Sequence, residues 1–273
     1  MRKVKGGEAE IPALGLGTWA LKGREARDMV ARALAEGWRH VDTARMYGNE
    51  AEVGQGIRDA AAPRDEVFLT TKIWPDDHAP DRLRAAAEDS LKTLGVEAVD
   101  LMLLHWPSKS VPFEETIPAL DALRRDGLAR HVGLSNFTRA QLDVVVPLME
   151  SPLTVNQVEF HPFLDQSAML DRLAREGAAL TAYSPLAKGE TARDRTLQEI
   201  GAAHGVGPVA AALAWILAKG AAAVPKTATP ERLGENLSAL EVDLTETEIT
   251  RIDALARPDG RMVDLAGVAP DWD

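Results

Sequence analysis

The sequence predicts one (β/α)₈ barrel, the TIM-barrel architecture, over residues 1–273. Short apolar runs alternate with helix-like segments along the whole chain, and they recur about every 30 residues, the length of one βα unit. The length of 273 residues also suits this fold, because an α/β barrel typically needs about 250. No linker or low-complexity stretch marks a second domain. An open, doubly wound sheet is the alternative.

Short strands separated by helices indicate a parallel sheet. The eight candidate strands are Leu14–Gly17, Trp38–Asp42, Val67–Thr71, Val99–Leu104, Arg130–Gly133, Thr154–Val158, Ala179–Tyr183 and Ala222–Val224. Five helices end at a glycine just before a strand, namely at Gly37, Gly95, Gly127, Gly177 and Gly220. Glycine is favoured there because it adopts the left-handed helix-ending conformation without a Cβ penalty.

Four segments lie outside the eightfold pattern. Val4–Ile11 predicts a small N-terminal β-hairpin that turns at Gly6-Gly7. Pro208–Lys219 and Thr245–Ala256 predict two extra helices. Arg257–Asp273, with two prolines and two glycines, predicts a C-terminal loop over the mouth of the barrel.

Composition narrows the classes of partner. The net charge of −11 argues against nucleic acid or anionic lipid, and any anionic cofactor would need a local basic cluster. The chain has no cysteine, which excludes disulfides and thiolate chemistry. No apolar h-region follows the basic N-terminus, and no apolar run reaches 18 residues. We therefore expect a cytoplasmic monomer that acts on a small molecule.

Polar and aromatic residues follow all eight candidate strands, where an α/β barrel carries its active site. In chain order they are Thr18-Trp19, Asp42, Lys72, His105, Ser135-Asn136, Gln157, Tyr183 and Lys226. Tyr47 lies five residues beyond Asp42 and is one of only two tyrosines in the chain. A single polar strand end is weak evidence, because strand ends meet solvent and are often polar. The occurrence of such residues after all eight strands is what indicates an active site.

These residue types suit the reduction of a carbonyl group by hydride. The developing alkoxide needs a proton, and Tyr47 can donate one if a nearby cation stabilises its phenolate. Lys72 is a candidate for that cation, with Asp42 holding its ammonium group in place. His105 can donate a hydrogen bond to the carbonyl oxygen. The ring of Tyr183 is placed to stack on a nicotinamide.

A basic cluster follows the last strand. Lys226 and the Thr227 hydroxyl leave this strand, and the next helix is predicted to begin near Pro230, a favoured first-turn residue. These groups, the helix N-terminal amides and Arg232 can converge on the 2′-phosphate of NADPH. The alternative is that Lys226 and Arg232 only solvate a helix face.

The whole chain resembles the aldo-keto reductase family through short motifs in a specific order. The matching segments are Gly15–Trp19, Asp42–Glu50, Thr71-Lys72, Leu103–Pro107, Gly133–Phe137, Asn156–Pro162, Tyr183–Leu186, Val224–Thr227 and Arg232–Asn236. The resemblance implies that Tyr47 is the acid, that Lys72 and Asp42 tune it, and that His105 orients the substrate. It also implies NADPH as the cofactor. Thr227 departs from the serine common in the family but keeps a hydroxyl.

The resemblance implies further contacts to the cofactor. Ser135, Asn136 and Gln157 would bind the carboxamide, and Tyr183 would lie under the nicotinamide ring. The other implied cofactor-binding residues are Thr18, Trp19, Asp42, Ser184, Leu186, Lys226, Thr227, Arg232, Glu235 and Asn236. The substrate pocket is predicted to involve Trp19, Tyr47, Trp74, His105 and Trp106. The ending Leu265–Asp273 resembles bacterial 2,5-diketo-gluconate reductases that also reduce methylglyoxal, which favours small polar dicarbonyls as substrates.

The sequence also bears on three other classes of function. Gly15–Ala20 matches a dinucleotide fingerprint only weakly, and neither tyrosine has a lysine four residues later, so a Rossmann enzyme is disfavoured. The six histidines form no paired metal motif, which disfavours a metal-dependent hydrolase. We expect His161 to be a structural hydrogen bonder, and His78 and His204 to lie at the surface. A non-catalytic, NADP-binding regulatory barrel stays open as an alternative.

Overall fold

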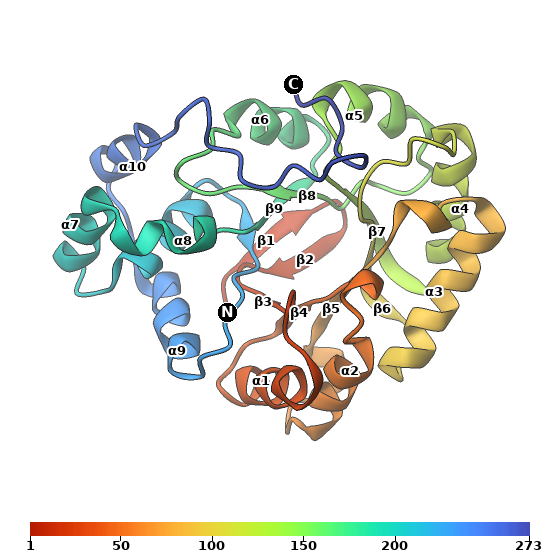
Figure 1. The fold of residues 1–273 in the computed structure, drawn as a ribbon, viewed down its shortest axis with the longest axis horizontal. Helices are drawn as coiled ribbons and strands as arrows, with labels where there is room; N and C mark the ends of the chain where they lie inside the picture. The colour runs from red at the N-terminus through yellow and green to blue at the C-terminus, as the bar shows by residue number, and fades with distance from the viewer.

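The computed structural model describes residues 1–273 and contains an eight-stranded parallel sheet and a separate hairpin. The strands of the large sheet follow chain order: β3 (Leu16–Gly17), β4 (His40–Asp42), β5 (Phe68–Ile73), β6 (Val99–Leu104), β7 (Ala129–Ser135), β8 (Val155–Glu159), β9 (Ala179–Tyr183) and β10 (Ala222–Ala223). Leu14 pairs in parallel with Ala223, and the Gly15 N–H donates to the Ala223 carbonyl at 2.8 Å. The sheet therefore closes on itself (Figure 1), which confirms the barrel and excludes the open sheet.

Ten helices accompany the strands. They are α1 (Gly23–Ala35), α2 (Glu50–Asp59), α3 (Pro80–Leu94), α4 (Phe113–Arg125), α5 (Arg139–Val145), α6 (Ser167–Arg175), α7 (Arg195–Ala203), α8 (Pro208–Ala218), α9 (Glu231–Leu237) and α10 (Glu246–Asp253). The five glycines predicted to end helices all have positive φ, between 66° and 96°. The structure thus confirms the residues that stop the barrel helices.

One of the extra helices is not the one that the sequence suggested. Both α7 and α8 lie between β9 and β10. Residues Ala210–Leu217 of α8 are all buried, whereas α7 buries only one face. A helix that is apolar all round needs cover on all sides. The helix outside the eightfold pattern is therefore α7, and α8 belongs to the barrel. The prediction of α10 as the second extra helix is confirmed.

The barrel interior is apolar at the end where the strands begin. Residues of the hairpin pack with residues from four strands in one buried cluster: Ala9, Ile11, Leu101, Leu103, Val155, Ala179 and Ala222. The hairpin consists of β1 (Lys3–Gly6) and β2 (Ala9–Pro12), and the Gly7 N–H donates to the Gly177 carbonyl at 2.8 Å. Gly6 pairs with Ala9, so the turn lies at Gly7-Glu8, one residue later than predicted. The hairpin closes this end of the barrel.

The C-terminal segment Arg257–Asp273 contains no helix or strand. Figure 1 shows it in dark blue, running from α10 past α6 to end beside α5. Trp272 packs against Trp106, which follows β6, with ring centroids 6.0 Å apart. The segment therefore crosses the end of the barrel where the strands finish, as predicted. No single helix is long and apolar enough to span a membrane; α7 and α8 reach that threshold only together, as a pair bent by 85°.

Candidate active site

Three of the four predicted catalytic side chains come from neighbouring strands. Asp42 is the last residue of β4, Lys72 is the next to last of β5, and His105 directly follows β6. The His105 N–H donates to the Ile73 carbonyl at 2.9 Å, which ties the end of β6 to the end of β5. Because these strands are adjacent and parallel, their C-terminal ends bring the three side chains to one place.

Tyr47 reaches the same place from a tight turn after β4. Residues Arg45–Tyr47 form one turn of 3₁₀ helix, which Gly48 ends in the left-handed conformation at φ 62°. The buried side chain of Asn49 donates to the carbonyls of Thr18 and Leu21 at 2.9 and 3.0 Å, fixing this turn against the loop after β3. Gly48 permits the reversal because it has no Cβ.

A hydrogen-bonded chain links the polar groups. The Lys72 ammonium, 1% exposed, donates to Asp42 Oδ1 at 2.5 Å and to the Thr43 carbonyl at 2.8 Å. It also lies 3.4 Å from the Tyr47 hydroxyl. Gln157 Nε2 donates to Asp42 Oδ2 at 2.7 Å. Asp42 is therefore oriented from two sides, and it holds Lys72 next to the phenol. The sequence offered no signal for the Thr43 carbonyl.

The electrostatics keep the protons on Lys72 and Tyr47. Burial acts to lower the pKa of Lys72, but Asp42 and Tyr47 outweigh it, and the pKa is raised overall. Burial raises the pKa of Tyr47, and Asp42 adds to this while Lys72 opposes it. Lys72 does lower the pKa of Tyr47, as expected, but desolvation of the phenolate is the larger effect and the pKa is raised overall. At neutral pH Tyr47 is a protonated acid with a cation beside it.

His105 is neutral and faces aromatic side chains. Burial lowers its pKa well below the ordinary range, and the positive charge of Lys72 lowers it further. Its ring centroid lies 5.7 Å from that of Tyr47 and 5.2 Å from that of Trp74. Trp19, which is 54% exposed, lies 4.9 Å from the Tyr47 ring. The buried Nδ1 of His105 has no hydrogen-bond partner within the protein. The other ring nitrogen, Nε2, also makes no hydrogen bond within the protein and is not enclosed, so it is the atom that can hydrogen bond to a ligand.

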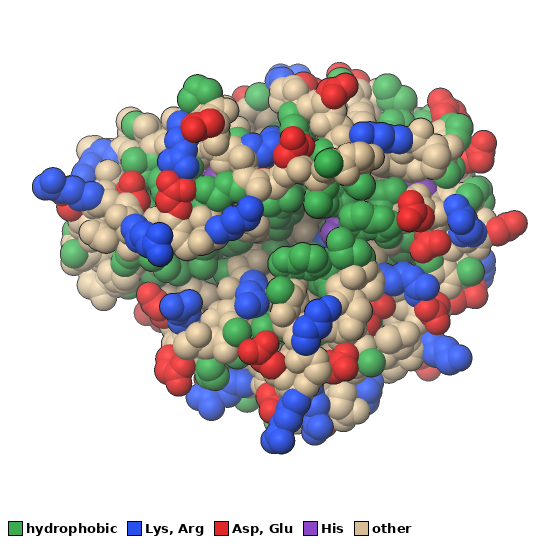
Figure 2. Space-filling view, viewed as in Figure 1, with side chains coloured by type: hydrophobic (Ala, Val, Ile, Leu, Met, Phe, Trp, Pro, Cys, Tyr) green, Lys and Arg blue, Asp and Glu red, His purple; other side chains and the backbone are tan.

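The structure does not bring Trp106 to the same surface. Its side chain is 2% exposed and lies under Trp272 of the C-terminal segment. Trp19 and Trp74 do flank Tyr47 and His105, as predicted for walls of a substrate pocket. Figure 2 shows this face hollowed near its centre, with hydrophobic side chains around a histidine.

A second polar cluster lies at the ends of β7, β8 and β9. The Ser135 hydroxyl donates to the Gln157 carbonyl at 2.8 Å, and Asn136 Nδ2 donates to the His105 carbonyl at 3.0 Å. The Tyr183 hydroxyl donates to Asn136 Oδ1 at 2.7 Å. Asn136 has φ 65°, a conformation that asparagine tolerates better than most residues. Together with the Gln157–Asp42 bond, these contacts make the two clusters one connected set.

The predicted adenosine-end residues lie beyond β10 and β9. Lys226 and Arg232 are exposed and form no ion pair, while Thr227 is buried and its hydroxyl accepts from the Thr229 N–H at 3.0 Å. The helix that follows begins at Glu231, as expected from Pro230. The remaining predicted residues lie in the same two segments: half-buried Ser184 and Leu186 after β9, and exposed Glu235 and buried Asn236 in α9.

The histidine predictions were partly correct. His161 Nε2 contacts Glu159 Oε1 at 3.1 Å, and both side chains are fully buried, as expected of a structural hydrogen bonder. His78 is 1% exposed rather than at the surface, because Nε2 bonds to the Ile73 carbonyl, and burial lowers its pKa to about 4. His204 is half-buried beside Glu248. Glu159 is not among the predicted site residues, although an acidic residue that ends an apolar strand is a usable signal.

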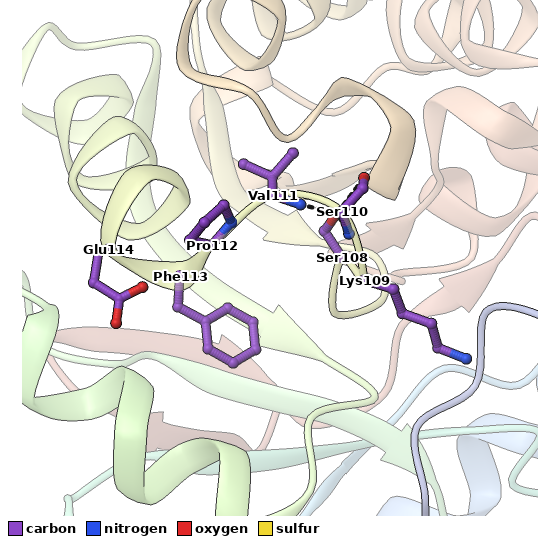
Figure 3. Close-up of a pocket in the computed structure, with 7 residues that line it drawn as sticks. All are labelled: Ser108, Lys109, Ser110, Val111, Pro112, Phe113 and Glu114. Carbon is purple, nitrogen blue, oxygen red and sulfur yellow. Dashed lines mark hydrogen bonds between the residues drawn. The ribbon is translucent and has the colours of Figure 1, made fainter.

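The loop after β6 forms a separate pocket of about 320 Å³. Figure 3 shows its lining residues, Ser108–Glu114, with the Ser108 hydroxyl accepting hydrogen bonds from the Ser110 and Val111 N–H groups. None of the four candidate catalytic residues lines it. Reactive side chains collect at the strand ends instead.

Comparisons with known proteins agree with this geometry. The model of the "Aldo/keto reductase family" matches residues 13–257. Methylglyoxal reductase DkgB from Salmonella typhi is 38% identical over 96% of this chain and 99% of its own length. The 9,11-endoperoxide prostaglandin H2 reductase from Trypanosoma cruzi is 39% identical over 90% of this chain and 88% of its own.

Solved structures give the same result. A crystal structure of a candidate 2,5-diketo-D-gluconic acid reductase B superimposes with a TM-score of 0.98 at 44% identity, covering 100% of this chain and 98% of the other. The aldose reductase from Schistosoma japonicum superimposes with a TM-score of 0.89 at 29% identity, covering 95% and 94%. The fold, the linked strand-end residues and these similarities lead to one conclusion: the chain belongs to the aldo/keto reductase family and is an oxidoreductase.

Proposed function

We propose that this protein is an NADPH-dependent reductase of small polar dicarbonyls, with Tyr47 as the proton donor. The observation that carries the proposal is the buried Asp42–Lys72–Tyr47 chain, with distances of 2.5 and 3.4 Å, set against a neutral His105. A structural ion pair would not need a phenol and an unpartnered imidazole beside it.

The residues present fit a nicotinamide cofactor. The buried hydroxyl of Thr18 has no hydrogen-bond partner within the protein, and it lies at the end of β3 beside Asp42, whose carbonyl accepts from the Thr18 N–H. Ser135, Asn136 and Gln157 offer amide and hydroxyl groups close by, and the Tyr183 ring supplies a flat apolar surface. We assign these residues to the nicotinamide end. When bound, the cofactor supplies the hydride.

The 2′-phosphate end rests on charge. Lys226 and Arg232 are unpaired cations in a protein with a net charge of −11, and the Thr227 hydroxyl directly follows Lys226 in the chain. Unpaired cations on an acidic protein favour a bound anion. We assign these three residues to the 2′-phosphate, which makes NADPH the preferred cofactor over NADH. Ser184, Leu186, Glu235 and Asn236 complete the proposed cofactor contacts.

The chain's own groups perform the proton transfer. His105 donates a hydrogen bond to the carbonyl oxygen and fixes its direction. Tyr47 donates its proton to the same oxygen as negative charge develops there. Lys72 then lies 3.4 Å from the new phenolate and stabilises it, while Asp42 and the Thr43 carbonyl hold the ammonium in place. Lys72 thus stabilises the phenolate form of Tyr47, which exists after proton transfer, more than the protonated form that precedes it.

The proposed substrate class follows from the aromatic side chains around Tyr47 and from the names of the similar reductases. Trp19 and Trp74 flank the proton donor, and methylglyoxal and 2,5-diketo-gluconate appear in the names of the similar reductases. Small dicarbonyls fit a pocket with flat aromatic sides and a polar floor.

The test is NADPH oxidation with methylglyoxal and 2,5-diketo-gluconate, followed at the NADPH absorbance, for the wild type and Tyr47→Phe. The variant keeps the ring but lacks the acid, so we expect kcat to fall by roughly 10² or more. NADPH affinity should change little. If the variant keeps more than about half of kcat with chemistry rate-limiting, the role of Tyr47 is wrong.

The same assay separates the rival functions. A regulatory barrel would bind NADPH and turn over neither substrate. A metal-dependent hydrolase finds no support in the structure, in which no three histidine, aspartate or glutamate side chains converge.

A further inference from the structure

Glu159 is a buried carboxylate that the proposed reaction does not use. It ends β8, two residues after Gln157, and its side chain is fully buried. Burying a charge is costly unless several donors satisfy it. Hydrogen-bond donors must therefore satisfy this carboxylate at the C-terminal end of β8.

The partners of Glu159 come mainly from the C-terminal segment. The Met262 N–H donates to Oε1 at 2.8 Å, and the Val263 N–H donates to Oε2 at 3.0 Å. His161 Nε2 approaches Oε1 at 3.1 Å. Burial alone would raise the pKa of Glu159, but these donors outweigh it and lower the pKa. The carboxylate thus clamps two successive backbone amides of a segment with no regular structure.

The clamped residues support an aromatic wall. The guanidinium of Arg261, adjacent to Met262, stacks over the Trp272 ring at 3.6 Å. Trp272 packs on Trp106, and Trp106 follows His105 in the chain. A second contact lies at the far end, where the Asp273 carboxylate accepts from the Arg139 and Ala140 N–H groups. Displacing Met262 and Val263 would displace Arg261 and loosen Trp272.

We propose that Glu159 is a positioning residue that fixes residues 261–273 as a wall of the substrate pocket, with Trp272 as the side chain that larger carbonyl substrates contact. The kinetic test of this proposal rests on the proposed reductase function. The effect reaches substrate only through the C-terminal segment, so it falls on KM of large substrates and spares the transfer step.

The kinetic test compares methylglyoxal with the larger 4-nitrobenzaldehyde in Glu159→Gln. Losing one aromatic contact, about 1.4 kcal/mol, should raise KM for 4-nitrobenzaldehyde about tenfold. KM for methylglyoxal should stay within about twofold, and both kcat values and NADPH affinity should be preserved. A loss of kcat, or an equal rise in both KM values, would overturn the proposal, because Glu159 would then act through β8 and Gln157.

Asp121 provides a matched control. This buried carboxylate in α4 also clamps two successive amides, those of Glu150 and Ser151, at 2.8 and 3.0 Å. The clamped residues precede β8 and so lie at the opposite end of the barrel. Asp121→Asn should lower stability to a comparable degree while leaving KM for both substrates unchanged. A KM change in this control would show that general loosening, and not the C-terminal wall, produces the effect.

A double-mutant cycle tests whether Glu159 affects substrate binding through Trp272. Trp272→Ala should reproduce the KM increase, and Glu159→Gln combined with Trp272→Ala should add nothing further. Additive increases would mean that the two residues act separately, against the proposal.

Hydrogen exchange tests the hydrogen bonds from the Met262 and Val263 amides to Glu159 even if Glu159→Gln does not fold. In the wild type, the Met262 and Val263 amides should exchange much more slowly than the exposed residues 264–267. Equal rates would refute the clamp. If the wild type reduces neither aldehyde with NADPH, the proposed reductase function fails, and the exchange result still stands by itself.

Discussion

The two ends of the barrel interior are built from the same strands and have opposite chemistry. Where the strands begin, Ile11, Val155 and Ala179 pack together in one buried hydrophobic cluster. Where they finish, Asp42 and Lys72 are also buried, yet they carry charge. One end gains stability from removing apolar surface from water. The other end bears the cost of burying charge, and its hydrogen bonds orient groups for chemistry.

The largest effect is expected from breaking the ion pair at the polar end. Lys72→Met removes the cation that stabilises the Tyr47 phenolate, so carbonyl reduction should fall by about 10² or more. It also leaves Asp42 buried without its cation, which typically destabilises by about 3–5 kcal/mol. Adding Asp42→Asn should restore stability in urea unfolding but not activity. Recovery of activity in the double variant would contradict the role of Lys72.

A smaller and purely structural effect is expected at the apolar end. Ile11→Ala leaves a cavity in the buried cluster between the hairpin and the strands and should lower the free energy of unfolding by about 2–5 kcal/mol. Below the unfolding transition, kcat and KM should match the wild type, because the site lies at the other end. Denaturant unfolding and steady-state kinetics at the same temperature measure both quantities. A changed kcat would show that the two ends are coupled through the strands.

A third prediction concerns the exposed cations, which lie outside both ends. Arg232→Ala should weaken NADPH binding roughly tenfold or more, since a charge-assisted hydrogen bond is worth about 1.5–3 kcal/mol. NADH binding should hardly change, because NADH has no 2′-phosphate. Raising salt should also weaken NADPH binding more than NADH binding. Tryptophan fluorescence titration measures these affinities, with the exposed Arg195→Ala in α7 as the control. Equal losses for both cofactors would assign Arg232 to another role.

The smallest effect is a flat pH profile around neutrality. The acid form of Tyr47 persists below its pKa, which is raised, and neutral His105 persists above its pKa, which is lowered. Both shifts widen the range in which the active forms coexist. With chemistry rate-limiting, kcat/KM should be level from about pH 7 to pH 9, judged from ordinary pKa values near 6.5 and 10. A fall in activity within this range would contradict the assigned protonation states, whose macroscopic values belong to the coupled set.

Several parts of the fold and site followed from local signals. The strands, the glycines that end the helices and the polar residue types at the strand ends were all visible in sequence, since each depends on neighbouring residues. Short motifs in a fixed order were enough to indicate the family. The turn of the hairpin was misplaced by one residue because Gly6 and Gly7 are equally suited to it.

Other features depend on contacts between distant residues. The assignment of α8 to the barrel, the burial of His78 and the covering of Trp106 by Trp272 are set by what packs against each of them. The raised pKa of Tyr47 follows from desolvation, which no local pattern encodes.

The sequence by itself determined which chemical groups the protein has and the order in which its strands present them. Only the tertiary structure decided how those groups act together: Lys72 beside Asp42 and Tyr47, and the Glu159 carboxylate on Met262 and Val263. The physical reason is that strand order and residue type depend only on residues close together in the sequence. Burial and hydrogen bonding across 25 to 104 positions of sequence arise only when the barrel closes.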